Sequence, residues 1–199
     1  MKFLFLLATS LLISQNDVCF EIHPNPNPTN SALNCFDKYV NVLGCFDIYA
    51  ESGVSDEKVL HVAAIAAELL DNNEDGVVDD NSIFESLQSQ AALMPVFTSD
   101  GNACMGQFED NYNGEGVSAV LWRNEIDPNN PGHWGDDATV EEVLHTINHI
   151  GHVQVYPNIF SLQPNSSTLS EAMDIARGGQ FLTIPSNYPE EAWYHYDDW

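Results

Sequence analysis

Basic side chains are the scarcest feature of this 199-residue sequence, which has 5 Lys and Arg against 30 Asp and Glu and a formal net charge of −25. Because phosphate groups are bound by cationic side chains, this balance excludes duplex nucleic acid as a partner. It excludes anionic membrane surfaces for the same reason. A surface rich in carboxylates instead attracts divalent cations. The composition therefore favours metal ions over polyanions as ligands.

Long apolar runs are also absent, apart from a short one at the N-terminus. Met1–Ile13 combines one cation, Lys2, with an apolar stretch, which is the pattern of a secretory signal. That stretch is too short to span a bilayer and no later segment is longer, so we predict no membrane span. We expect residues 1–19 to be a signal peptide and the Pro-rich residues 20–32 to be an extended linker. The mature protein is then secreted.

Cysteine is rare, with four residues in the whole sequence: Cys19, Cys35, Cys45 and Cys104. Secretion favours disulfides, and Cys35–Cys45 is the nearest candidate pair. Cys104 would then pair with Cys19 or with a cysteine beyond residue 199. The aromatic run at the end of the sequence, without a helix stop, leads us to expect a further C-terminal piece. The sequon at Asn165 predicts an exposed, glycosylated loop.

What is present is enough for one folded domain over residues 33–199. Hydrophobic residues make up 44% and aromatic residues 11%, which argues against disorder. Hydrophobic periodicity predicts an α+β fold with a small sheet and about four helices. The strands are expected near residues 40–50, interrupted at Gly44, and at 94–98 and 117–122. The helices are expected at 56–70, 83–93, 138–152 and 168–177, and residues 99–116 are expected to be loop-rich. Because Pro95 has no N–H to donate, we expect residues 94–98 to be an edge strand.

The most specific motif follows the first helix, at residues 71–82. Side-chain oxygens of Asp71, Asn73, Asp75 and Asp79, with the carbonyl of Val77, have the spacing of calcium ligands, and Gly76 supplies the sharp turn. The segment resembles the calcium loops of EF-hands, dockerins and thrombospondin repeats. It departs from them at its twelfth position, where Ser82 replaces the bidentate Glu, so that Asp80 or Glu85 would have to substitute. The alternative is an acidic turn joining two helices.

A second candidate site lies on the helix predicted over residues 138–152. At about 100° per residue, one face gathers two carboxylates and three histidines, and the other face is apolar. The polar face consists of Glu141, Glu142, His145, His149 and His152. Two histidines four residues apart project side by side and can reach one zinc or similar ion. Two alternatives remain: a merely solvated face, and a capping box of Thr139 with Glu142.

The order of these elements resembles the gluzincin type of zinc metallopeptidase. His145-Thr146-Ile147-Asn148-His149 keeps the two histidines of H-E-x-x-H, and Glu171, on the next helix, matches the third ligand. The resemblance implies a zincin-like arrangement and zinc-dependent hydrolysis. An alternative reading of Glu171 is a capping box with Thr168.

The sequence departs from that family at the general base. Thr146 stands where the catalytic Glu is expected, and a hydroxyl cannot accept a proton from zinc-bound water as a carboxylate does. Glu142 or Glu141 would have to act instead, one turn earlier. Alternatively, His152 completes a set of three histidines with His145 and His149. We expect His61, off the apolar face of its helix, to be an exposed residue without a role.

Two functions therefore stay open. One is a secreted, acidic protein that binds Ca²⁺ and a transition metal without catalysis. The other is a secreted zinc-dependent hydrolase with a displaced general base.

Overall fold

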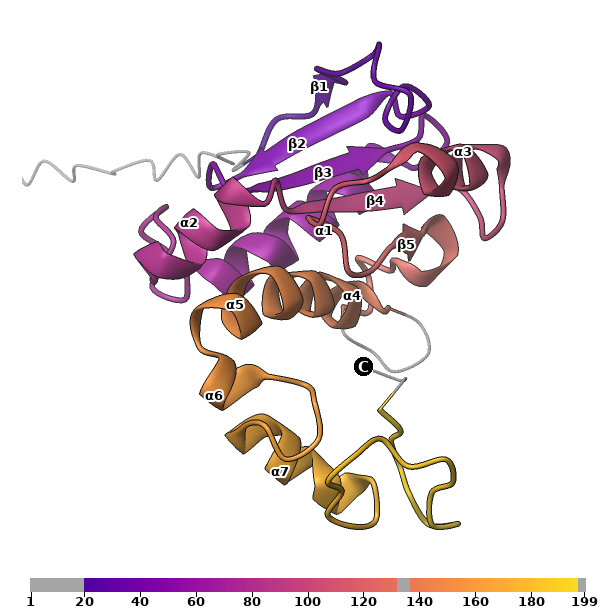
Figure 1. Ribbon diagram of the computed structural model, residues 1–199. Helices are drawn as coiled ribbons and strands as arrows, with labels where there is room; N and C mark the ends of the chain where they lie inside the picture. The colour runs from indigo at the N-terminus through magenta and orange to yellow at the C-terminus, as the bar shows by residue number, and fades with distance from the viewer. Residues whose placement is uncertain (1–19, 132–136, 197–199) are drawn as a thin grey trace, which may run out of the picture.

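A five-stranded sheet with helices on both faces forms the upper part of the molecule (Figure 1). The computed structural model describes residues 20–131 and 137–196, so the expected signal peptide lies outside the described residues. The strands are β1 (His23–Pro24), β2 (Lys38–Val42), β3 (Phe46–Ala50), β4 (Leu93–Phe97) and β5 (Leu121–Trp122), and they lie in this order across the sheet. The α+β prediction is confirmed.

Strand directions change at the middle of the sheet. β1 and β2 pair antiparallel, as do β2 and β3, whereas β4 runs parallel to both β3 and β5. The β2–β3 hairpin turns through Leu43 and Gly44, both with positive φ (49° and 78°), as a tight hairpin turn requires. Residues 20–32, predicted to be an extended linker, are part of the fold. β1 pairs with β2 in the sheet, and Ala32 is buried.

The prediction that β4 is an edge strand is wrong, because β4 is flanked by β3 and β5 and all five of its residues are buried. Pro95 is tolerated there for a geometric reason. The N–H of Leu93 donates to the carbonyl of Gly116, on the β5 side, and backbone alternation places the Pro95 nitrogen on that same side. Pairing with β5 begins only at Val96, so Pro95 removes no ladder hydrogen bond.

Two of the predicted helices match closely and two differ. The helices are α1 (Asp56–Leu70), α2 (Asn81–Ser89), α3 (Ala103–Asn111), α4 (Thr139–Thr146), α5 (Val153–Val155), α6 (Pro157–Phe160) and α7 (Thr168–Ala176), with a 3-10 turn, η1 (Arg123–Glu125), and a π-helical segment, η2 (Ile147–His152). α2 ends before residue 93 because Ala91 takes a positive φ (53°) on the way into β4. α3 replaces a predicted loop, because the Asn102 side chain caps it by accepting from the Met105 N–H (2.8 Å). No helix in the described residues is long and apolar enough to cross a membrane.

The sheet separates two apolar cores. α1, α2 and the α4–η2 helix cover one face, over a core that includes Phe46, Ile48, Met94, Leu87 and Ile147. α3 and residues 32–36 cover the other face, over a core with Phe36, Tyr49, Leu93, Phe97 and Phe108. Along β3 and β4, successive side chains enter opposite cores, as the period of two requires.

The C-terminal residues form a lower lobe that begins with α6 (Figure 1). In the described chain, neither apolar core contains a residue beyond Val155. Four polar side chains are buried in the lobe instead: Ser167, Ser170, Asp174 and Arg177. The Arg177 guanidinium lies over the Tyr196 ring at 3.7 Å from its centroid, and the Tyr196 hydroxyl donates to Asp174 (2.6 Å). Polar contacts therefore organise this lobe.

The disulfide joins Cys35 to Cys104, so the predicted Cys35–Cys45 pair and the other partners expected for Cys104 are wrong. The reason is the sheet itself. Cys35 and Cys104 belong to the core on the α3 face, whereas Cys45 is buried as a free thiol in the core on the α1 face. Cys35 and Cys45 are close in the sequence, but they lie in cores on opposite faces of the sheet.

We predict that replacing Cys35 and Cys104 by Ser lowers the free energy of unfolding by about 4 kcal/mol, because the disulfide spans 69 residues. Thermal and denaturant unfolding measure the loss. Cys45→Ala is the matched control, and its smaller cost of about 1 kcal/mol reflects one atom removed from the core. Non-reducing peptide mapping that links Cys45 to either partner would contradict the assignment.

Candidate metal and acid–base sites

The predicted calcium loop connects α1 to α2 on the α1 face of the sheet. Its first predicted ligand, Asp71, is 7% exposed, and its side chain turns back over the loop. The two Asp71 carboxylate oxygens accept from the N–H groups of Gly76 (2.7 Å) and Asp75 (3.2 Å). Gly76 has a φ of +83°, which is the left-handed turn that glycine allows. The loop therefore closes on its first carboxylate.

The remaining predicted ligands lie around the rim of this loop. Asn73, Asp75, Val77 and Asp79 are exposed, and Val78 is buried and anchors the loop in the core. Asp79 is held in place because its carboxylate accepts from the Asn72 N–H (3.0 Å) and its own N–H donates to the Leu70 carbonyl (2.9 Å). The predicted oxygens thus come from one short segment with a defined path.

Asp80 caps α2. Its carboxylate accepts from the Ser82 N–H (2.8 Å), and its second oxygen accepts from the Tyr156 hydroxyl (2.6 Å). These hydrogen bonds stabilise the charged form and lower the pKa of Asp80. Both Asp80 oxygens therefore already accept hydrogen bonds within the protein. Glu85 is the remaining candidate for the calcium ligand that Ser82, at the twelfth position, does not supply.

The predicted histidine helix is continuous from Thr139 to Val155, but its centre is π-helical. There the Ile150 carbonyl accepts from two α2 side chains, Ser86 Oγ (2.7 Å) and Gln90 Nε2 (3.0 Å). α2 can approach because residue 151 is glycine: a Cβ there would lie 3.1 Å from a methyl carbon of Ile83. π-helical turns are frequent at functional sites.

This π-helical segment disperses the predicted stripe of histidines. His145 is half-buried, and His149 is exposed. His152 is partly buried and stacks on Phe160, with 4.8 Å between ring centroids. Burial lowers the pKa of both His145 and His152, since the neutral ring is favoured away from water. The charge of His149 also contributes to lowering the pKa of His145.

Glu171 is exposed on α7 and does not form the predicted capping box. The helix is capped instead by Ser167 and Ser170, each side chain accepting from the other residue's N–H (3.0 Å). Within residues 20–131 and 137–196, no group of three or more His, Cys, Asp or Glu lies close enough together to hold a metal. The zinc set of His145, His149 and Glu171 therefore stays a prediction.

Glu142 is a half-buried carboxyl in the first turn of α4. Burial, followed by the nearby charges of Glu141 and Glu125, raises its pKa from 4.5 to about 7. Glu125, in η1, likewise has a raised pKa, mainly because of burial. A carboxyl that titrates near neutral pH can both accept and donate a proton. Glu141 is exposed, and one of its oxygens lies 4.0 Å from His145 Nε2.

Thr146, at the position of the gluzincin base, has no access to this site. It is fully buried, and its hydroxyl has no hydrogen-bond partner among the described residues. Thr146 therefore faces the core, and a Glu there would bury a carboxylate.

His61 is not the exposed residue that the sequence suggested. Its Nε2 lies 3.0 Å from Asp137 Oδ2, and the other Asp137 oxygen accepts from Thr139 Oγ1 (2.6 Å). This contact also replaces the predicted Thr139–Glu142 capping box. His61 and Asp137 together tie α1 to the start of α4. Sequence reasoning had no signal for the pair, because the residues are 76 positions apart.

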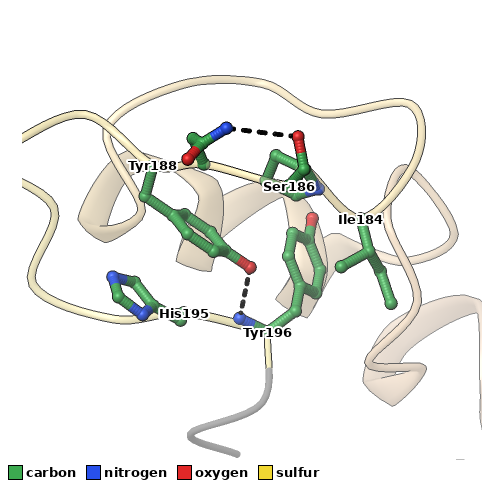
Figure 2. Close-up of a pocket in the computed structure, with 7 residues that line it drawn as sticks. Ile184, Ser186, Tyr188, His195 and Tyr196 are labelled. Atoms are coloured by element: carbon green, nitrogen blue, oxygen red, sulfur yellow. Dashed lines mark hydrogen bonds between the residues drawn. The ribbon is translucent and has the colours of Figure 1, made fainter.

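A pocket of about 580 Å³ lies in the lower lobe (Figure 2). Tyr188 and His195 stack at its side, with 4.0 Å between ring centroids, and the Tyr196 N–H donates to the Tyr188 hydroxyl (2.8 Å). Its lining contains no carboxylate: Ile184, Pro185, Ser186, Asn187, Tyr188, His195 and Tyr196. It is therefore not a candidate for calcium.

Comparison with known proteins identifies no relative: no family model, curated protein or solved structure matches this chain.

We predict that Glu142→Gln stabilises the protein increasingly as pH rises. Because its pKa is raised on folding, protonated Glu142 contributes stability that is complete below pH 4.5 and is lost as pH rises through about 7. Gln mimics the protonated form at every pH. Melting temperatures between about pH 5 and pH 8 should diverge by the equivalent of about 1 kcal/mol, since water screens a half-exposed carboxyl.

Glu109→Gln is the control for this prediction, because Glu109 is an exposed carboxyl on α3 and is not among the charges that raise the pKa of Glu142. A difference between Glu142→Gln and wild type that does not change with pH would show that Glu142 titrates normally.

Proposed function

We propose that this chain is a secreted, acidic calcium-binding protein whose site is the loop at residues 71–82. The observation that carries the proposal is the buried Asp71 carboxylate, which closes the loop onto Gly76 (2.7 Å). This contact holds the first ligand at the centre of a turn whose other oxygens follow at Asn73, Asp75, Val77 and Asp79. Hard oxygen ligands of this kind select Ca²⁺ over softer transition metals.

The electrostatic environment supports the same ion. The loop carries Asp71, Glu74, Asp75 and Asp79 within nine residues, in a chain of net charge −25. Mutual repulsion among these carboxylates is relieved when a divalent cation binds. The disulfide supports secretion, because such bonds persist in oxidising compartments.

A second candidate function is zinc-dependent hydrolysis at the α4–η2 helix. The observation that favours it is the pKa of about 7 at Glu142, one helical turn before His145. His145 and His149 would hold zinc, with Glu171 or His152 as the third ligand. Glu142 would then accept the proton of the attacking water, with Glu141 as the less perturbed alternative. With Glu171 as the third ligand, this candidate needs Glu171 to approach from α7.

We predict that calcium raises the melting temperature through the 71–82 loop. A ligand that binds only the folded state adds about 2.7 kcal/mol at a hundredfold excess over its Kd. Asp75→Ala should remove most of the gain, whereas Asp110→Ala, which deletes an exposed acid on α3, should retain it. Calorimetry with millimolar calcium measures the effect. An unchanged melting temperature for the wild-type protein would leave the loop as an acidic turn only.

We predict separately that His145→Ala and His149→Ala each abolish stoichiometric zinc binding and leave calcium binding intact, because the two sites lie on different elements. Zinc requires neutral imidazoles, so affinity should fall as pH drops below about 6.5. His152→Ala should have a smaller effect if Glu171 is the third ligand. Titration with zinc at neutral pH checks this, and no binding by the wild-type protein would remove the hydrolase candidate.

A further inference from the structure

α1 has two apolar stripes, and only one of them is buried. The core stripe consists of Val59, Val62, Ala63, Ala66 and Leu70. The second stripe consists of Leu60, Ala64 and Ala67, at the i, i+4 and i+7 spacing that aligns side chains on one helix face. Ala64 is exposed, and Leu60 and Ala67 are only partly buried.

A groove of about 590 Å³ runs along this second stripe. Phe20 and Leu43 also line it, from the start of the described chain and from the β2–β3 hairpin. Ala64 and Ala67 line the groove with short side chains, where a larger residue would take up part of the space. The groove therefore offers apolar surface to water along a rigid helix.

One end of the groove is acidic. Glu68, Asp71 and Glu74 line it, together with Gly76 of the calcium loop. The basic side chains of the described residues are engaged elsewhere. Lys38 binds Asp56, Lys58 binds the carbonyls of Arg123 and Ile126, Arg123 binds the carbonyl of Gly53, and Arg177 pairs with Asp174. None of these four cations of the described residues neutralises this end of the groove.

We propose that this groove binds an amphipathic segment of a basic protein, with apolar side chains against Ala64 and Ala67 and Lys or Arg against Glu68 and Glu74. The negative charge of the protein around the groove favours a basic partner over an acidic protein or an anionic membrane. A second copy of this chain would bring another net charge of −25 and be repelled, and an anionic lipid surface would be repelled likewise. A helix with one apolar stripe and flanking cations satisfies both parts of the groove.

The inference does not rest on calcium binding. Glu68 and Glu74 are not among the predicted calcium ligands, and the apolar floor belongs to α1. Asp75→Ala, which should remove calcium binding, leaves the lining of the groove intact. Failure of the calcium proposal and failure of the groove proposal are therefore separate results.

The test is the binding of a fluorescent 14-residue peptide of Leu and Lys at helical spacing, measured by anisotropy at low and moderate salt. A peptide with Glu in place of Lys is the probe control. We expect Ala64→Phe, which fills the floor, to weaken binding about tenfold or more. We expect the pair Glu68→Lys and Glu74→Lys to weaken it by a similar factor, with a reduced dependence on salt.

A charge-matched pair, Glu57→Lys with Glu109→Lys, separates the groove from general attraction to an acidic protein. Both residues are exposed and neither lines the groove. This pair should retain most of the affinity, as should Asp75→Ala. Melting curves confirm that each variant is folded. Equal losses in the two charge-reversed pairs, or full affinity in Ala64→Phe, would overturn the proposal.

Discussion

Parallel pairing of β3 with β4 is the constraint on which the rest of this structure depends. Two parallel neighbours cannot be joined by a hairpin, so the chain must leave the sheet and return along one face. α1, the 71–82 loop and α2 make that crossover. The 71–82 loop consequently joins two packed helices where the chain reverses direction. α2 then packs against the π-helical segment at Gly151. The predicted calcium loop lies on this crossover, and α2 of the crossover contacts the helix that carries the histidines.

Local signals in the sequence were enough for α1, β2 and β3 in the upper part of the molecule. The period of α1, the alternation in β2 and β3, and the turn at Gly44 all matched, because each depends on neighbours within a few residues. The 71–82 loop was recognisable for the same reason: its glycine, carboxylates and flanking helix are contiguous. The predicted ligand roles themselves remain to be measured.

Contacts between distant residues account for what the sequence could not predict. Pro95 is acceptable in a central strand only because of where β5 begins to pair, and Cys35 meets Cys104 only because the sheet separates it from Cys45. The π-helical segment is stabilised by Ser86 and Gln90 of α2, which no helical periodicity anticipates. Once that segment is present, a stripe drawn at 3.6 residues per turn no longer describes which histidines share a face.

The lower lobe has a thermodynamic consequence of its own. Heat-capacity change on unfolding comes mainly from apolar surface, and the lobe buries the polar side chains of Ser167, Ser170, Asp174 and Arg177. Its opening therefore contributes little curvature to the stability of the whole chain. Its local opening energy is also small compared with that of the sheet, because few apolar contacts resist it. Amide protons in α7 should exchange with solvent through a local opening, whereas those in β3 and β4 should exchange only through global unfolding.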